Sequence, residues 1–372
     1  MRLLIERSEL FRALSHVASV VERRTTIPIL SNVLVRADDG HVSFKGTDLE
    51  REVIETVPAD VTQAGAVTIQ AHLLHDIVRK LADGSQITLD GAGGGERLTL
   101  TCGHAKFQLP ALAADEFPDI GAGEMPHEFD IPAHELRRLI EKARFAISTE
   151  ETRYYLNGIY LHTTVSAGKP VLRAVATDGH RLAQIEQPAP NGAAGMPGVI
   201  VPRKTVNEVH KLLEGSDEDV RVSLSAQRIQ FKTEKVTMTS KLIDGTFPDY
   251  QRVIPQGNNK VMNVGNAEFA NAVDRVATVS TERGRAVKLA IERDKLILSV
   301  TNPDGGSATE EIPVDYDADR LEIGFNARYL LDIAGQLESP TVRFFLSDAG
   351  SPTTVRDEGD ENALYVLMPM RV

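Results

Sequence analysis

The sequence predicts an α+β fold in which one unit, made of two helices and several short strands, occurs three times along the chain. Three observations support this prediction: an amphipathic helical segment recurs three times, a second helix recurs with it, and strand and loop landmarks return in the same order. Self-similarity at a fixed period identifies repeat architectures. The recurrences therefore decide the fold class before any single residue is interpreted.

The first recurring helix is predicted at three places, which are 9–20, 134–144 and 268–277. The segments IERSELFRAL, IPAHELRRLI and VGNAEFANAV lead into the three copies. Their apolar residues are spaced i, i+4 and i+7, as in Leu10, Leu14 and Val17. This spacing places them on one stripe of a helix, which the fold can bury.

The second recurring helix is predicted at 71–81, 204–212 and 327–337. Each copy is followed by a segment with alternating apolar residues (QITLD, VRVSL or VRFFL). Alternation is typical of a strand whose successive side chains face opposite sides of a sheet. The dipeptide Thr47-Asp48 returns as Thr177-Asp178 after 130 residues and as Thr301-Asn302 after a further 124. FPDI likewise returns as FPDY after 130 residues.

This period predicts three domains, at 1–125, 126–257 and 258–372. The joins GAGEMPHE and PQGNNK are rich in Gly, Pro and polar residues, as linkers usually are. Repeats joined head to tail either close into a ring or extend as a filament. Six units of this size, from two chains, would surround an opening of roughly 35 Å, whereas three would leave almost none. The repeat therefore permits a dimeric ring wide enough for a DNA duplex.

Composition limits the class of protein. The chain of 372 residues has one cysteine, and no apolar run approaches the length of a membrane span. Its first residues, MRLLIERSEL, interrupt the apolar stretch that a signal peptide needs. We therefore expect a cytoplasmic protein with no membrane partner. The net charge of −12 argues against a uniformly basic, nucleic-acid-binding surface.

Basic residues are nevertheless concentrated in the predicted helices, which carry a small excess of Lys and Arg. Arg137 and Lys142 lie in one helix, and Arg203 and Lys204 open another. Helices with such residues are suited to phosphate contacts, although ordinary solvated helix faces would have the same composition.

Two motifs have both a functional and a structural interpretation. ATDGHRLA places Asp178 close to His180, but no nucleophile or metal-ligand spacing accompanies them, so we predict no catalytic residue, metal or cofactor. In RYYLNG, one of Tyr154 and Tyr155 should be exposed and able to pack against a base or sugar, unless both are ordinary strand aromatics.

The chain resembles the β subunit of bacterial DNA polymerase III, the sliding clamp, over essentially its whole length. The matching stretches are TIPILSNVLV, GTDLE, RYYLNG, ATDGHRLA, VIVPRK, FPDYQRV, IGFNARYLLD and MPMR. The resemblance implies a head-to-tail homodimer, a ring of six similar domains around duplex DNA with helices lining the hole. It also implies a processivity factor without catalytic activity, which tethers the replicative DNA polymerase and is placed on DNA by an ATP-driven clamp loader.

The family binds the polymerase, other polymerases and repair proteins through a short peptide that carries Leu and Phe. The resemblance implies a pocket for this peptide between the second and third domains. The matching positions are Leu156, Thr177, Gly179, His180, Arg181, Leu182, Pro248, Arg252, Val253, Val366, Met368, Pro369, Met370 and Arg371. This chain departs from the family in the loop AGSP, where Gly350 and Pro352 change one wall and leave peptide preference open.

For DNA, the resemblance points to Arg24, Tyr154 and Tyr155. For the dimer it points to Phe107 and Leu109 in the first domain, against Thr278 and Val279 in the third, with acidic Glu310 and Glu311 nearby.

Two other classes of protein remain open on the residues alone. One is a hydrolase or transferase that uses Asp178 and His180, and the other is a monomeric, three-domain, peptide-binding module.

Overall fold

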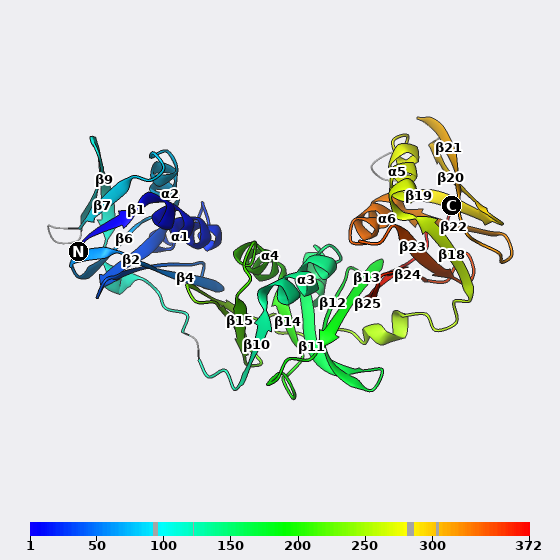
Figure 1. The fold of residues 1–372 in the computed structure, drawn as a ribbon, viewed down its shortest axis with the longest axis horizontal. Coiled ribbons are helices and arrows are strands. Elements are labelled where there is room, and N and C mark those ends of the chain that lie inside the picture. The colour runs from blue at the N-terminus through cyan, green and yellow to red at the C-terminus, as the bar shows by residue number, and fades with distance from the viewer. Residues whose placement is uncertain (92–95, 122, 281–285, 303–304) are drawn as a thin grey trace. The chain divides into compact units, whose positions relative to one another are not determined.

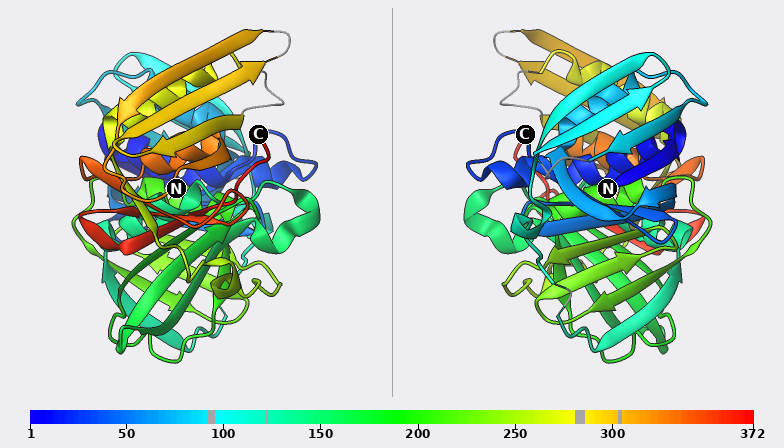
Figure 2. Two further views of the ribbon diagram at one scale, coloured as in Figure 1. Left: turned by 90° about the vertical axis from the view of Figure 1, so that its right-hand side faces the viewer. Right: turned by 90° about the vertical axis from the view of Figure 1, so that its left-hand side faces the viewer.

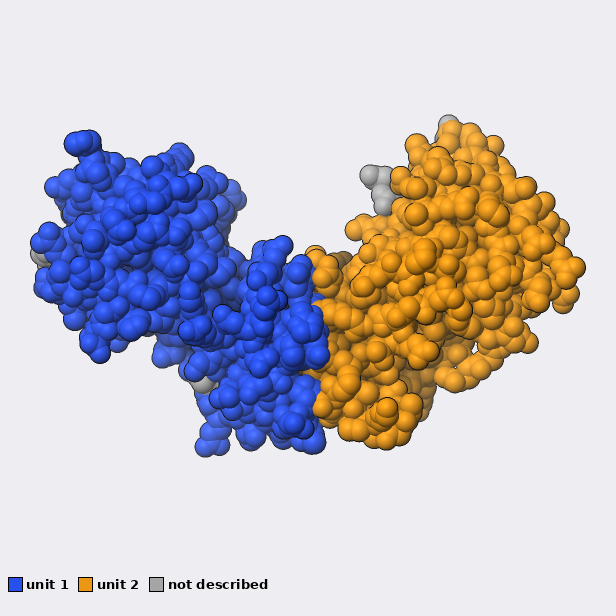
Figure 3. Space-filling model, viewed as in Figure 1, with its two compact units in different colours: residues 1–137, 190–197, 204–242 blue, residues 138–189, 198–203, 243–372 orange. Residues whose placement is uncertain are grey.

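The structure is a computed structural model that describes residues 1–372 except 92–95, 122, 281–285 and 303–304 (Figure 1). It divides into two compact units (Figure 3). Unit 1 comprises Met1–Arg137, Pro190–Pro197 and Lys204–Leu242. Unit 2 comprises Arg138–Ala189, Gly198–Arg203 and Ile243–Val372.

The predicted helices are present, two in each repeat. Their bounds are α1 (Arg7–Val20), α2 (Ala71–Arg79), α3 (Ala133–Arg144), α4 (Arg203–Leu212), α5 (Asn266–Ala277) and α6 (Ala327–Ala334). Every one of them begins at the residue after a strand ends. The predicted stripe of α1 is confirmed, because Leu10, Leu14 and Val17 are all at most 1% exposed. Glu6 caps this helix by accepting hydrogen bonds from the amides of Ser8 and Glu9.

Unit 1 contains one antiparallel sheet of thirteen strands. In spatial order the strands are β10 (His127–Pro132), β15 (Asp219–Leu224), β16 (Arg228–Lys232), β17 (Val236–Lys241), β4 (Arg51–Pro58), β3 (His41–Thr47), β2 (Asn32–Asp38), β6 (Gly65–Gln70), β9 (Ala105–Leu112), β8 (Arg97–Cys102), β7 (Gln86–Asp90), β1 (Arg2–Glu6) and β5 (Asp60–Gln63). The cyan strands β7 to β9 lie side by side in the right-hand view of Figure 2.

Unit 2 contains an eight-stranded and a four-stranded antiparallel sheet. The first has the order β14 (Val199–Pro202), β11 (Gly158–Ser166), β12 (Lys169–Thr177), β13 (Arg181–Pro188), β25 (Asp360–Leu367), β24 (Thr353–Asp357), β23 (Thr341–Leu346) and β18 (Lys260–Gly265). The second has the order β21 (Gly306–Pro313), β20 (Lys295–Asn302), β19 (Ala286–Glu292) and β22 (Leu321–Asn326), with β20 and β21 forming the long gold ribbon in the left-hand view of Figure 2.

Two of these strand pairs join consecutive repeats. In unit 1, β4 of the first repeat pairs with β17 of the second, with Val53 opposite Met238. In unit 2, β13 of the second repeat pairs with β25 of the third, with Ala183 opposite Tyr365. We call these pairs the first and second joints. Because each joint continues a sheet, the division into units passes through the middle repeat, whereas the boundaries near 125 and 258 remain a prediction about the repeats.

No helix in the described residues is both long and apolar enough to span a membrane.

Candidate functional site

An apolar cluster in unit 2 forms the base of the predicted peptide site. Leu156, Leu182 and Val366 from the predicted set are each at most 4% exposed. They pack in this cluster with further buried side chains, which are Val175, Ile200, Phe247 and Tyr250. These residues come from the short helical turn Glu151–Leu156, the strands β12, β13, β14 and β25, and the connector 243–254.

Exposed residues surround this base. Of the predicted set, those exposed are Gly179, His180, Pro248, Arg252, Val253, Met368, Met370 and Arg371, while Thr177 and Pro369 are half-buried. Val253, Met368 and Met370 are large apolar side chains that remain 47%, 37% and 38% exposed. Since apolar area in contact with water is unfavourable, a ligand that covers these side chains gains free energy.

The segment 368–372 is attached to its own chain at two points. The Met368 amide donates to the His180 carbonyl oxygen at 2.9 Å, and the Met370 amide donates to the Gly324 carbonyl oxygen at 2.8 Å. His180 in turn stacks on Tyr329 of α6, with ring centroids 6.4 Å apart. Both exposed methionines are therefore positioned by main-chain hydrogen bonds.

Arg181 requires a correction, because we expected it to take part in the peptide pocket and its side chain is buried, with 8% exposure. Its guanidinium bonds to Asp178, to Asp332 of α6 and, at 2.7 Å, to the Phe145 carbonyl oxygen. It also lies 5.1 Å and 4.3 Å from the ring centroids of Phe145 and Tyr329. Arg181 thus fastens the second joint and is not available to a peptide.

The sequence interpretation missed Arg153. Gly179 has a φ of 89°, and a Cβ atom there would lie 2.5 Å from Nη1 of Arg153. The lack of a side chain at Gly179 is what lets this guanidinium lie over the loop. A side-chain hydrogen bond from Arg153 lowers the pKa of Glu150 and raises the pKa of Arg153. The only signal in the sequence was that Arg153 precedes the two tyrosines of RYYLNG.

A polar network holds the connector 243–254 on the sheet. The Tyr250 hydroxyl lies 3.0 Å from Nε2 of His162 and accepts a hydrogen bond from Arg173 at 2.9 Å. Arg173 also forms an ion pair with Glu186 at 2.6 Å. Burial, followed by the nearby Arg173 charge, lowers the pKa of His162, because both disfavour a second positive charge.

The two tyrosines of the predicted DNA site have different environments. Tyr154 is 54% exposed, whereas Tyr155 packs against the apolar cluster. Their rings meet edge to face, with centroids 5.7 Å apart. Tyr154 is therefore the tyrosine with a ring free to stack on a nucleotide.

The predicted basic residues divide into exposed and buried groups. Arg24, Arg203 and Lys204 are exposed, and Lys204 forms an ion pair at 3.0 Å with Glu22 in the loop of Arg24. Arg137 is half-buried.

Lys142 is a second correction, because we expected a DNA contact and found it 5% exposed. Its ammonium donates to the Gln336 carbonyl oxygen at 3.0 Å and forms ion pairs with Glu338 and Asp360. These partners belong to the third repeat, so Lys142 helps to attach that repeat to α3.

The predicted dimer residues lie at strand edges and helix ends. Phe107 and Leu109 are in β9, where Phe107 is half-buried and Leu109 is 5% exposed within its own unit. Leu109 therefore offers little new apolar area to a partner, contrary to our expectation. Thr278 is exposed, and Val279 accepts a hydrogen bond at 2.9 Å from Asn302, at the end of β20.

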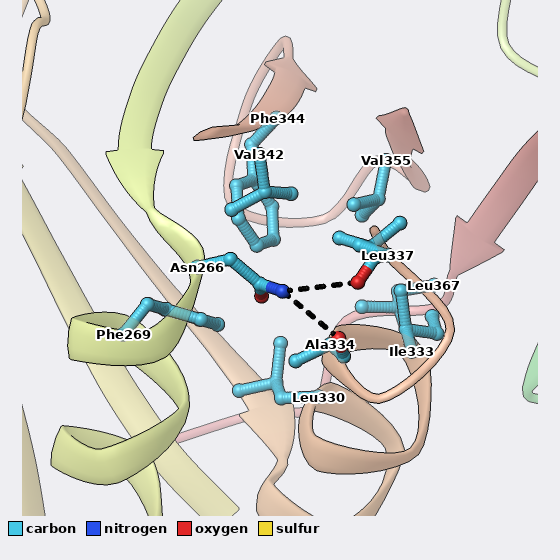
Figure 4. A pocket seen from close by; sticks show the side chains of 10 residues that line it. All are labelled: Asn266, Phe269, Leu330, Ile333, Ala334, Leu337, Val342, Phe344, Val355 and Leu367. Atoms are coloured by element: carbon cyan, nitrogen blue, oxygen red, sulfur yellow. Dashed lines mark hydrogen bonds between the residues drawn. The ribbon is translucent and has the colours of Figure 1, made fainter. Parts of the chain in front are cut away.

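A pocket beneath α5 and α6 is separate from the predicted site (Figure 4). It is lined almost wholly by apolar side chains, and Asn266 donates across it to the Ala334 and Leu337 carbonyl oxygens. The space is too small for a water molecule, so it belongs to the packed core.

The loop of Gly350 and Pro352, where the sequence departs from the family pattern, is held by Asn258. The Asn258 side-chain amide donates to the Pro352 carbonyl oxygen at 2.9 Å.

The Asp178 and His180 pair has a structural role. The Asp178 carboxylate accepts from the amides of His180 and Arg181 and from the Arg181 guanidinium. Among the described residues, no group of three or more His, Cys, Asp or Glu side chains could hold a metal ion.

Comparisons with known proteins agree on one family. Profiles of the DNA polymerase III beta subunit match the chain as its N-terminal domain at residues 1–121, its central domain at 130–249 and its C-terminal domain at 251–371. The beta sliding clamp of Caulobacter vibrioides is 52% identical, with both chains covered completely. A crystal structure of a Bartonella birtlesii sliding clamp bound to griselimycin is 52% identical and fully covered, with a TM-score of 0.97. A structure of the Caulobacter crescentus beta sliding clamp, with polyethylene glycol at a proposed beta-motif tethering region, also has 52% identity and a TM-score of 0.97, and covers 100% and 99% of the two chains. The three domain matches and these relatives show that the chain belongs to the DNA polymerase III beta subunit family.

Proposed function

We infer that this chain is a DNA sliding clamp: two copies form a ring that encircles duplex DNA and tethers the replicative polymerase. Its family and the names of its relatives support this role. The observation that carries the proposal is a pair of strands, one in the first repeat and one in the third, each of which has an edge without a strand partner among the described residues. The ring acts passively and has no catalytic site of its own.

The two joints within each chain follow one rule. The strand after a Thr-Asp loop pairs with the last strand of the next repeat, as β4 does with β17 and β13 with β25. After the third copy of the loop comes β21, and the last strand of the first repeat is β9. Within the described residues, β21 pairs only with β20, and positions 105–110 of β9 pair only with β8. We propose that β21 of one copy pairs with β9 of another.

The register of the first two joints carries over to this proposed third joint. The pair Val53 and Met238, and the pair Ala183 and Tyr365, correspond to Phe107 opposite Ala308. Gln108 then lies opposite Ser307. Lys106 on β9 and Glu310 and Glu311 on β21 add opposite charges across this contact. A head-to-tail contact repeated by two chains closes a ring of six repeats.

Cysteine cross-linking tests this contact. Gln108 and Ser307 are exposed, and residues opposite each other on antiparallel strands have Cα atoms about 4.5–5.5 Å apart, within disulfide range. The Gln108→Cys/Ser307→Cys variant, with Cys102→Ser, should oxidise to a covalent dimer. The matched control Gln108→Cys/Thr309→Cys is two residues out of register and should cross-link far less. Equal yields, or a monomer in sedimentation, would contradict the register or the dimer.

Encirclement has its own test. The cross-linkable variant is mixed with circular plasmid, oxidised and washed at high salt, which removes phosphate contacts but not a closed ring. We expect retained protein that is released when the plasmid is cut once. Equal retention on linear and circular DNA would exclude encirclement. The proposed DNA contacts are the exposed residues Arg24, Tyr154, Arg203 and Lys204. Arg137, which is half-buried, is proposed as a further contact.

The apolar cluster and its exposed methionines are the proposed peptide site. An extended peptide with Leu and Phe would cover Val253, Met368 and Met370, and each buried apolar side chain contributes roughly 1.5–3 kcal/mol. The Caulobacter crescentus relative has a region proposed to tether a beta motif. Through this site the ring would bind the replicative polymerase, other polymerases, repair proteins and an ATP-driven clamp loader. Calorimetry with a Leu-Phe peptide tests it, and no heat of binding to folded dimer would reject it.

A further inference from the structure

We propose that Gly324 is a positioning residue for the peptide site, because its missing side chain lets the segment 368–372 lie against β22. The inference rests on the proposed peptide-binding function and adds a residue outside the predicted set. Gly324 lies in β22, a strand at the edge of its four-stranded sheet. It forms an isolated antiparallel bridge with Met370.

Gly324 is not needed for backbone conformation. It is absent from the glycines with positive φ, so any L-residue could adopt its backbone angles. Close approach is what requires it. A Cβ atom at this position would lie 2.8 Å from the Met370 carbonyl oxygen and from Cγ2 of Val372, and nearer still to Cγ1 of Val372. Carbon atoms make favourable contacts at about 3.5–4.0 Å, so an alanine would displace the segment.

The displaced residues are those that a peptide would contact. The Met370 amide donates a hydrogen bond to the Gly324 carbonyl oxygen, and the Met368 amide donates one to the His180 carbonyl oxygen. Pro369 between them has no amide hydrogen to donate. Loss of the Gly324 attachment would leave the segment held at one end only. Met368 and Met370 would then have to be ordered at the moment of binding, which lowers affinity.

The main test compares Gly324→Ala with Gly265→Ala. Gly265 is in the same repeat, and a Cβ atom there meets its nearest neighbours at 3.8 Å, an ordinary contact. We expect Gly324→Ala to weaken binding of a Leu-Phe peptide by on the order of tenfold, the equivalent of one lost apolar anchor. Gly265→Ala should bind like the unsubstituted protein. Both variants should keep the unsubstituted melting temperature and dimer.

A rescue separates positioning from general damage. Val372→Gly removes two of the three atoms nearest to a Cβ at 324, the two Cγ atoms, and keeps the third, the Met370 carbonyl oxygen. The double variant Gly324→Ala/Val372→Gly should therefore recover part of the lost affinity, although Val372→Gly alone gains nothing. In hydrogen exchange, Gly324→Ala should lose protection at the Met370 amide and keep it along β25.

The outcomes distinguish this inference from the function on which it rests. If the unsubstituted dimer binds no peptide, the proposed peptide site fails. If it binds, but Gly324→Ala binds within twofold of it, or keeps the Met370 amide protected, the positioning role of Gly324 is overturned. If Gly324→Ala does not fold, Met370→Pro provides the second measurement, because it deletes the amide that donates to Gly324. Met370→Ala is its control, and equal affinity of these two variants also overturns the role.

Discussion

The first and second joints share one backbone framework. In the loops 47–51 and 177–181, the threonine hydroxyl donates to the arginine carbonyl oxygen at 2.7 Å in both. The aspartate carboxylate accepts from the amides two and three residues later in both. A residue at the end of the partner strand donates to the carbonyl oxygen of the fourth loop residue at 2.9 Å: Lys241, the last residue of β17, in the first joint, and Met368, the residue after β25, in the second. The hydrogen-bond pattern of the main chain therefore does not explain why peptide binding is assigned to one joint.

The side chains on this framework make the difference. In the second joint, Leu182 lies opposite Val366 on the apolar cluster. In the first joint, the matching pair is Glu52 and Thr239. Lys45 forms ion pairs there with Glu52 at 2.8 Å and Asp119 at 3.2 Å. Charged groups that are already paired offer no apolar area, so the same fold has exposed apolar side chains at one joint, where peptide binding is proposed, and paired charges at the other.

The side-chain hydrogen bonds of the two joints also differ. Arg51 donates to Asp48 of its own loop, whereas Arg181 donates both to Asp178 of its own loop and to Asp332 of the next repeat. At the position of Asp332, the sixth residue of α6, α4 has Glu208, which forms its ion pair with Lys211 of the same helix at 3.1 Å.

The largest expected effect comes from removing these arginines. Arg181→Ala leaves Asp178 and Asp332 without their buried partner and should lower the free energy of unfolding by on the order of 3–5 kcal/mol. Arg51→Ala should lower the free energy of unfolding by about 1.5–3 kcal/mol less than Arg181→Ala does, because Arg51 lacks the additional hydrogen bond to a charged group. Denaturant unfolding of both variants measures the difference. Equal losses would mean that the Asp332 contact adds nothing.

A transplant of the first joint into the second is the next test. Leu182→Glu alone places a charge in the apolar cluster and should destabilise the protein by roughly 3–5 kcal/mol. Adding Val175→Lys supplies the counterpart of Lys45 and should restore part of that stability. Neither variant should bind a Leu-Phe peptide in calorimetry. Peptide binding by the folded double variant would show that the apolar pair is not what distinguishes the joints.

Deletion of residues 368–372 removes the exposed Met368 and Met370, whereas the residue that matches Met368 in the first joint is the charged Lys241. Losing the contacts of Met368 and Met370, at about 1.5–3 kcal/mol each, should lower peptide affinity by on the order of a hundredfold or more. The dimer contact is assigned to β9 and β21, so sedimentation should still show a dimer. A truncated dimer that binds peptide at full strength would move the site away from this segment.

A smaller effect is expected from acid. Strand pairing places His162 opposite Arg173 in the second repeat, and Arg36 opposite Ser43 at the matching place in the first. The pKa of His162 is lowered in the folded protein. Its contribution to stability is therefore present above the ordinary histidine pKa of about 6.5, and it is lost as the pH falls below that value. The melting temperature should fall less between pH 7.5 and 5.5 in His162→Gln than in the unsubstituted protein, and an equal fall would contradict this role.

Much of the fold could be predicted because its signals are local. The spacing of Leu10, Leu14 and Val17 depends on a few turns of one helix, and the period was visible in loops such as 47–51 and 177–181. The burial of Arg181 and Lys142 in ion pairs could not be predicted in the same way. Their partners, among them Asp332 and Asp360, are more than a hundred residues away in the sequence. A basic residue on a helix or loop has the same local pattern whether it faces water or a carboxylate from another repeat.

The candidate site shows the same limit. The positions that form its base, such as Leu182 and Val366, came from resemblance, and the structure brings them together. Arg153 and Gly324 act through close approach of atoms, which neither composition nor periodicity records. Tyr329 lies in the predicted helix 327–337, but its contacts with the His180 ring and the Arg181 guanidinium depend on the loop of another repeat.

The ladder between β4 and β17 has a consequence for synthesis of the chain. It joins residues 51–55 to residues 236–240, so β4, which pairs with β3 on one side, has an open edge on the other until the second repeat has emerged from the ribosome. At about 5–20 residues per second, that delay is roughly ten to forty seconds. An unpaired edge strand is a template for aggregation, and contacts between distant residues form slowly. A nascent chain therefore passes through an interval in which this edge is open, and β4 has charged side chains, among them Glu52 and Glu55, of the kind that disfavours pairing with a foreign strand.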